Sequence, residues 1–135
     1  MRFVVIFCLM LMVASTSAYC ADWVEVSKGS YYDKSSIDSI GKKVSVKVKM
    51  DATDVFQSTR GQKASYFLIN LVLNCQTMTY RELGSGAIDT NGKPMGVISG
   101  KNTENEILGS PYVDIGKKVC TKDDARKSPS QKKKK

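Results

Sequence analysis

The feature that most constrains this chain is the run ASYFLINLVLNC at Ala64–Cys75, where apolar residues occupy every second position up to a cysteine. One alternating set is entirely apolar and the other is mixed; the apolar set is Phe67, Ile69, Leu71, Leu73 and Cys75. Alternate side chains of a β-strand point to opposite faces, so the run predicts a strand with one face in a core. A short helix is the competing interpretation, but the aromatic and β-branched content and the missing N-cap favour the strand.

A second strand is predicted over Lys42–Ala52, where apolar side chains alternate with serine and lysine. The apolar set is Val44, Val46, Val48 and Met50, and the polar set is Ser45, Lys47 and Lys49. One face of such a strand packs in a core and the other meets water. If the protein has a binding surface, we expect it on this lysine-bearing side of the sheet, in the loops or in the tail.

Shorter elements surround these two strands. Strands are predicted at Asp22–Ser27, near Tyr31–Asp33 and at Thr77–Leu83, with a turn or bulge near Gln76. Asn91-Gly92 predicts a hairpin between Ala87-Ile88 and Met95–Ile98. The polar segment Asp51–Lys63 predicts a loop, and Gly84-Ser85-Gly86 predicts a break or bend.

The end of the domain predicts a short helix. Ser110-Pro111 supplies an N-cap and a first helical residue, and Tyr112, Ile115 and Val119 then fall on one helical face that leads to Cys120. Cys75 and Cys120 end two predicted elements and are the natural pair. Their disulfide would contribute about 4 kcal/mol in the chain-entropy model. The predicted fold class is α+β: an antiparallel sheet with a short C-terminal helix packed on it and one strand-to-helix disulfide.

The first 18 residues predict a secretory signal peptide, with Arg2, an apolar stretch and small residues before a cleavage site. No later run approaches the roughly 20 apolar residues of a transmembrane helix. Cys20 is then left over as a free thiol, a mixed disulfide or a link in a homodimer, unless cleavage follows Cys20 itself. Lipidation of Cys20 is disfavoured because Tyr19 precedes it.

The charge of +8 is concentrated at one end of the chain. Tyr19–Cys120, the predicted domain (residues 19–120), has 13 basic and 11 acidic residues. The predicted disordered tail, residues 121–135, has seven basic and two acidic residues and ends in Lys132, Lys133, Lys134 and Lys135. This tail predicts either a solubilising segment or a tether to an anionic envelope. Nucleic acid is not an expected partner, because no aromatic residues interleave with these lysines.

The composition argues against an enzyme. The chain has no histidine, which excludes serine–histidine and cysteine–histidine catalysis, and the carboxylates do not cluster. No cysteine spacing suits zinc and no glycine-rich phosphate loop follows a strand, so neither a metal nor a cofactor is expected. Cys75 and Cys120 lack the C-x-x-C arrangement of a redox pair, which favours a structural bridge.

Two groups of residues are candidates for a binding patch. Lys42, Lys43, Lys47 and Lys49 predict a basic stripe for glycan sulfate, lipopolysaccharide phosphate or an acidic protein, against the alternative of a solvated outer face. Tyr31 and Tyr32 predict either a recognition patch or packing at a sheet edge, and packing is favoured.

The order of these motifs resembles the surface-adhesin protein E family of small exported bacterial proteins. The resemblance rests on Trp23 in an opening strand, Tyr32-Asp33 before Ser36-Ile37, the alternating strand Val44–Asp51, Ser65 leading to Asn74-Cys75, and Pro111 to Val119-Cys120. It covers about residues 22–120 and implies the same sheet, helix and disulfide. It also implies an adhesin-like role. This chain departs from the family's usual pattern at Lys47, Asn74 and Tyr19.

These observations predict an exported, non-catalytic interaction module, periplasmic or secreted rather than lipid-anchored. Its expected partner is a protein or an anionic polymer of the host matrix or the bacterial envelope. The alternative is a periplasmic inhibitor or accessory protein that acts on another exported protein. A small-ligand carrier ranks last, because a sheet covered by one short helix leaves little room for a pocket.

Overall fold

The computed structural model describes residues 20–121, so the predicted signal peptide and nearly all of the predicted basic tail lie outside the described residues. Within them, eight strands form one antiparallel sheet in the spatial order β1-β2-β4-β5-β6-β7, and β3 and β8 pair with β4 and β6. The strands are β1 (Trp23–Ser27), β2 (Ser30–Asp33), β3 (Asp38–Ile40), β4 (Lys43–Asp51), β5 (Tyr66–Asn74), β6 (Thr79–Ile88), β7 (Pro94–Ser99) and β8 (Asn105–Glu106). Three short helical elements complete the fold: a 3-10 helix η1 (Lys34–Ser36), α1 (Asp54–Arg60) and α2 (Val113–Val119). The predicted α+β class is confirmed.

The two strands predicted from alternation form the centre of the sheet. They pair over their full length, from Lys43 opposite Asn74 to Asp51 opposite Tyr66. The apolar set of each strand is buried: Val44, Val46, Val48 and Met50 in β4, and Phe67, Ile69, Leu71 and Leu73 in β5. Because opposite residues of an antiparallel pair share a face, these eight side chains form one apolar surface.

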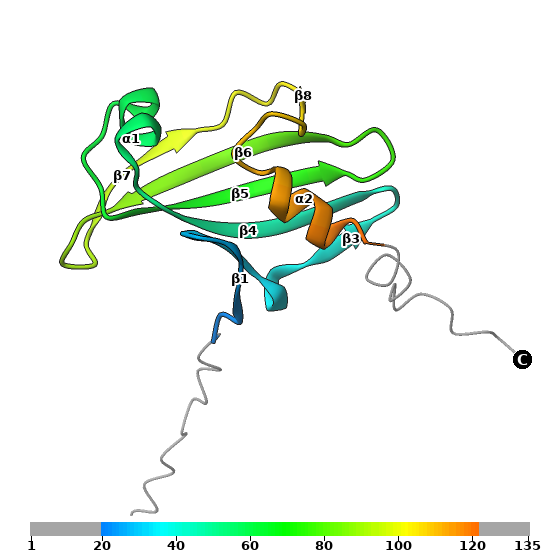
Figure 1. Cartoon of the computed structure of the whole chain (residues 1–135), viewed down its shortest axis with the longest axis horizontal. Coiled ribbons are helices and arrows are strands. Elements are labelled where there is room, and N and C mark those ends of the chain that lie inside the picture. Colours follow the sequence, from blue (N-terminus) through cyan, green and yellow to red (C-terminus); the bar gives the residue numbers. More distant parts are fainter. Residues whose placement is uncertain (1–19, 122–135) are drawn as a thin grey trace, which may run out of the picture.

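Helix α2 covers that apolar surface (Figure 1). Tyr112, Ile115 and Val119 are all buried in the same core as the two central strands, as their helical spacing predicts. Cys120 follows the helix and forms a disulfide with Cys75, with 5.2 Å between their Cα atoms. The strand-to-helix disulfide is therefore confirmed. Cys20 is a free, exposed thiol.

The segment Asp51–Lys63 is not the predicted loop, because it contains helix α1. Thr53 caps the helix by accepting a hydrogen bond from the backbone N–H of Phe56 at 3.2 Å, and Gly61 ends it in the left-handed conformation. The ring of Phe56 packs edge-on against Phe67 with 4.9 Å between ring centroids, so α1 lies on the same face of the sheet as α2. Seven residues are too few for a clear helical period, but the caps were readable in the sequence.

Of the two alternatives predicted at Gly84-Ser85-Gly86, a break or a bend, the break does not occur. β6 runs unbroken from Thr79 to Ile88, because β5 pairs with one edge of this glycine-containing stretch and β7 with the other. Leu83 has no partner in β5 and forms a β-bulge. Regular pairing of β6 with β5 continues on both sides of this residue. The predicted turn after Cys75 and the hairpin around Asn91-Gly92 are both present.

Two further predictions need correction. Helix α2 begins at Val113 rather than at Pro111, and Ser110 instead forms a turn in which its hydroxyl donates to the carbonyl of Ile107. Strand β2, which contains Tyr31 and Tyr32, is not at the edge of the sheet but between β1 and β4. Tyr32 is 5% exposed and belongs to the core, so it is removed from the predicted binding patch.

Candidate functional site

Both helices cover one face of the sheet, and no element within residues 20–121 covers the other, which we call the open face. Residues of the open face align in a row across six strands: Glu25 opposite Tyr31, Tyr31 opposite Lys49, Lys49 opposite Leu68, Leu68 opposite Gly86, and Gly86 opposite Val97. Since opposite residues share a face, this register fixes which side chains meet on the open face. Lys49, predicted from the sequence as part of a basic stripe, lies in the middle of this row.

Lys49 is surrounded by aromatic rings. Its ammonium nitrogen lies 4.3 Å from the ring centroid of Tyr31, 5.5 Å from that of Trp23 and 5.8 Å from that of Tyr66. The negative faces of aromatic rings attract a cation at such distances. Three rings from three different strands therefore hold this charge at the open face, and no ion pair to Lys49 occurs within residues 20–121.

The other predicted lysines are spread along the same strand or next to it. Lys43 and Lys47 share the open face with Lys49, and Lys47 is exposed. Lys47 is close enough to Asp33 for its charge to contribute to lowering the pKa of that carboxyl. Lys42 is exposed in the turn between β3 and β4. The structure therefore brings three of the four predicted lysines onto one strand face, with Lys42 beside them.

Apolar side chains extend the open face beyond the lysines. Val97 of β7, which the register places on this face, is 84% exposed. Leu68 and Val72 of β5 lie on the same face and are half-buried. The open face thus combines a basic stripe, an aromatic cluster and an apolar region, a mixture typical of interaction surfaces rather than of a fully solvated face.

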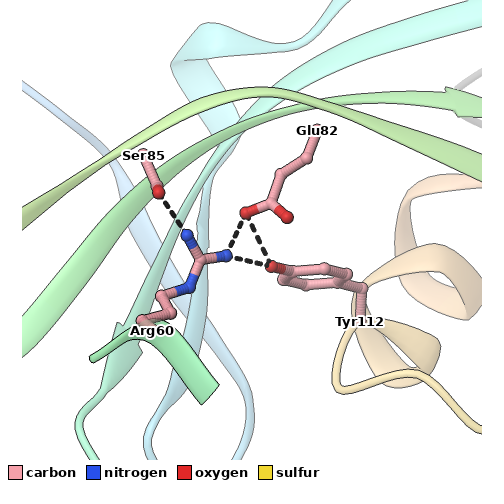
Figure 2. A network of polar contacts seen from close by, with 4 residues as sticks. All are labelled: Arg60, Glu82, Ser85 and Tyr112. Carbon is pink, nitrogen blue, oxygen red and sulfur yellow. Dashed lines mark hydrogen bonds and ion pairs between the residues drawn. The ribbon is translucent and has the colours of Figure 1, made fainter. Parts of the chain in front are cut away.

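A second polar site lies on the covered face (Figure 2). The guanidinium of Arg60, the last residue of α1, forms an ion pair with Glu82 and a hydrogen bond to the Ser85 hydroxyl, both in β6. It also donates to the Tyr112 hydroxyl at 3.1 Å, while that hydroxyl donates to Glu82 at 3.2 Å. The side chains of Arg60 and Glu82 are only 11% and 24% exposed.

Burial and the neighbouring charge of Glu82 raise the pKa of two tyrosine hydroxyls in and beside this network. Burial raises the pKa of the Tyr112 hydroxyl far above its ordinary value, and the negative charge of Glu82 raises it further. Burial and Glu82 also raise the pKa of Tyr80, whose ring packs edge-on against Tyr112 at 5.0 Å between centroids. Both tyrosines therefore stay protonated at neutral pH, and Tyr112 remains a hydrogen-bond donor to Glu82.

A cleft of about 600 Å³ opens beside the network, between α1, the segment from Ser99 to Asn105 and the residues before α2. Gly100 shapes its rim, because a Cβ atom at this position would lie 1.7 Å from the carbonyl oxygen of Glu82. The charged groups at the floor, Arg60 and Glu82, already neutralise each other. This arrangement fits a cross-link between α1, β6 and α2 better than a ligand site.

Sequence reasoning missed the residues that give both sites their character. Trp23 and Tyr66 were predicted to lie in strands, but the sequence does not show that β1 and β5 place their rings next to Lys49. Arg60 was placed in a loop and Glu82 in a strand. The capping pattern of Thr53 and Gly61 was the signal that could have placed Arg60 at the end of a helix.

Neither a metal cluster nor a membrane-spanning helix occurs in the described part of the chain. Among residues 20–121, no group of three or more histidine, cysteine, aspartate or glutamate side chains could hold a metal ion. No helix in this range is both long and apolar enough to cross a membrane.

Together, the fold and the open face define a small disulfide-bonded α+β domain with a single sheet, one face under helices and the other exposed.

No protein-family model matches the chain, and a comparison with curated proteins found no match. Two solved structures of protein E from Haemophilus influenzae are similar to it. One, at 14% identity and a TM-score of 0.49, covers 73% of this chain and 83% of that chain. A second crystal form, at 13% identity and the same TM-score, covers 73% and 86%. A likeness at this level carries no argument about function, and membership of the surface-adhesin protein E family stays a prediction.

Proposed function

We propose that this protein is an exported, non-catalytic interaction module that binds an anionic polymer or an acidic protein surface through the open face of its sheet. The observation that carries the proposal is the position of Lys49, a cation held by three aromatic rings on a solvent-facing sheet surface. Aromatic residues are enriched at recognition surfaces, and an ammonium fixed in place loses less side-chain entropy on binding than a mobile one.

The covered face supports two parts of the proposal, the absence of catalysis and export. Glu82 is bound by Arg60 and Tyr112, and Ser85 is 4% exposed and accepts from Arg60, so neither is available to a substrate. The disulfide between Cys75 and Cys120 fits an oxidising compartment, which supports export. The proposed partners are polymers or proteins of the host matrix or the bacterial envelope, in keeping with an adhesin-like role.

The test is binding of the full-length exported protein to two immobilised polyanions, dextran sulfate and poly-L-glutamate. We expect Lys47→Glu/Lys49→Glu to lower affinity for both at least tenfold, and the loss to shrink as salt rises. Lys47→Gln/Lys49→Gln serves as a milder second variant should the reversed charges impair folding. If the folded variants bind both polyanions with unchanged affinity, the open face is not the binding surface.

Two control variants separate the open face from other basic regions. Lys117→Glu/Lys118→Glu reverses two exposed charges on α2, which lies on the covered face, and we expect little change in binding. Replacement of Lys132–Lys135 by alanine measures what the basic tail contributes. A larger loss in either control than in the Lys47/Lys49 variant would place the binding site elsewhere.

A further inference from the structure

Asp33, the last residue of β2, is a buried carboxylate with one oxygen that accepts no hydrogen bond. The residue is only 1% exposed. Its Oδ1 atom accepts hydrogen bonds from the N–H and the hydroxyl of Ser35 and, at 2.9 Å, from the backbone N–H of Asp22. Its Oδ2 atom is buried as well, but no donor within residues 20–121 bonds to it. Since an unsatisfied buried carboxylate oxygen is costly, a cation that donates to Oδ2 would stabilise the fold.

The segment that precedes β1 lies next to this carboxylate. Asp22 is fixed on both sides: its N–H bonds to Oδ1 of Asp33, and its carbonyl accepts from the backbone N–H of Lys34 at 2.8 Å. Ala21 comes one peptide earlier. Because the nitrogens of successive residues lie within about 4 Å of each other, the Ala21 nitrogen is within about 7 Å of Oδ1. Rotation about the Cα–C bond of Ala21 moves this nitrogen relative to the fixed Asp22 and can bring it to Oδ2.

The nitrogen of Ala21 becomes a cation if the peptide bond before it is cut. In the intact chain it is an amide with one N–H, bonded to Cys20. Hydrolysis of the Cys20–Ala21 bond by a signal peptidase consumes one water and leaves a carboxylate on Cys20 and an ammonium on Ala21. The ammonium carries three N–H donors and a positive charge. Charge-assisted hydrogen bonds of this kind are the stronger class, and they suit a buried carboxylate oxygen.

The residues around this bond suit a signal peptidase. The enzyme reads small residues at the first and third positions before the cut, and Cys20 and Ala18 occupy these positions. A cut after Ala18 would instead keep Tyr19 and Cys20, and with them an exposed, unpaired thiol in an oxidising compartment. A cut after Cys20 leaves only Cys75 and Cys120, which are bonded to each other.

We infer that a signal peptidase cleaves this chain after Cys20 and that the new α-ammonium of Ala21 forms an ion pair with Oδ2 of Asp33. The inference goes beyond the proposed binding function and rests only on the export that this function includes. Asp33 is also the N-cap of η1 and lies opposite Trp23 of β1. The ion pair therefore fixes the start of β1, whose Trp23 ring contacts Lys49 on the open face.

The first test is the intact mass of the exported protein, made in a bacterial host from the full-length chain with its own signal sequence. We expect a mature chain that begins at Ala21 and contains no free thiol. Cys20→Ser keeps a small residue before the cut and should give the same first residue, whereas Cys20→Leu should abolish cleavage at this bond. A parent chain that begins at Tyr19 overturns the inference and leaves export intact. A parent chain that still begins at Met1 contradicts export as well.

The second test measures the pKa of the α-amino group in protein labelled with 13C-alanine, because the methyl resonance of Ala21 reports its protonation. A carboxylate partner raises the pKa of an ammonium, so we expect a value about one pH unit above the ordinary 7.7–8.0. Asp33→Asn should restore the ordinary value. Asp38→Asn, at an exposed position in β3, is the matched control and should titrate like the parent.

The titration of the parent decides the question even if Asp33→Asn fails to fold. An ordinary α-amino pKa in a folded parent that begins at Ala21 would show that the ion pair does not form. A raised pKa that persists in folded Asp33→Asn would assign the effect to another carboxylate and also overturn the inference.

Discussion

The two faces of the sheet differ in how their residues are used. On the covered face, every large apolar side chain of β4 and β5 is buried, and the charged groups Arg60 and Glu82 are paired with each other. On the open face, Val97 is exposed, and the Lys49 ammonium contacts aromatic rings instead of a carboxylate. Covered-face residues therefore determine stability, whereas open-face residues are available for binding. The predictions below test that division, beginning with the largest effect.

Removal of the disulfide should have the largest effect on stability. Cys75→Ser/Cys120→Ser should lower the free energy of unfolding by about 4 kcal/mol, because the cross-link limits the entropy of the unfolded chain. Chemical denaturation under non-reducing conditions measures this loss. Cys20→Ser is the matched control and should leave the unfolding midpoint unchanged, because Cys20 is exposed and unpaired. A control as unstable as the double variant would contradict the assigned pairing.

Two leucines of β5 provide a direct comparison of the faces. Leu71 is fully buried, so Leu71→Ala should cost about 2–5 kcal/mol through lost burial and a residual cavity. Leu68 is only half-buried on the open face, and Leu68→Ala should cost less than about 1 kcal/mol. Urea unfolding of the two variants measures the difference. Similar losses would mean that the open face is covered by something in solution.

The Arg60 network should be a stabilising cross-link. Glu82→Gln would leave the largely buried Arg60 guanidinium without its counter-charge, at a cost of about 1–3 kcal/mol. Glu106→Gln, at an exposed position in β8, is the matched control and should change stability by less than about 0.5 kcal/mol. Thermal unfolding gives the comparison, and binding to dextran sulfate should be the same in both folded variants. A selective loss of binding in Glu82→Gln would reassign function to the covered face.

The smallest expected effect is a dependence on pH through Asp33. Burial by itself would raise the pKa of this carboxyl, but hydrogen bonds from Ser35 and from the backbone N–H of Asp22 outweigh it, with help from the charge of Lys47. The net result is a pKa below the ordinary value. A carboxyl with a lowered folded-state pKa contributes stability that is present above its unfolded-state pKa of about 3.9. That stability is lost as pH falls through the folded-state pKa.

Acid titration of the unfolding midpoint tests this expectation. Asp33→Asn should be less stable than the parent at neutral pH, and the difference should narrow below about pH 4. Asp38→Asn, at an exposed position in β3, should follow the parent at every pH. If the difference in unfolding midpoint between Asp33→Asn and the parent stays constant down to pH 2, the charge of the Asp33 carboxyl does not stabilise the fold.

The two central strands, the C-terminal helix and the disulfide could all be predicted from the sequence. Alternation in Val44–Met50 and Phe67–Leu73 sufficed to predict two central strands and their buried faces, because a strand buried on one side must repeat every two residues. The helical spacing of Ile115 and Val119 and the cysteine at each element's end predicted the helix and its disulfide. These features follow from residues close together in the chain, which is why they could be read without a structure.

Other features depended on partners distant in the sequence. Glycine is a poor helix former, yet α2 contains Gly116, because a Cβ atom there would lie 2.2 Å from the Cδ1 atom of Ile107 and close packing requires the glycine. β6 continues through Gly84 and Gly86 because strands on both sides pair with it. In each case the deciding contact comes from another element, so local propensity pointed the wrong way.

The candidate site also combines features that the sequence predicts with features that depend on the tertiary structure. The sequence by itself determined that lysines would occupy the solvent-facing side of β4, because their alternation with valines leaves them no other position. Only the tertiary structure decided that Trp23, Tyr31 and Tyr66 surround Lys49. The physical reason is register: hydrogen bonding between strands fixes which residues become neighbours across the sheet, and a single chain's alternation fixes only which face they share.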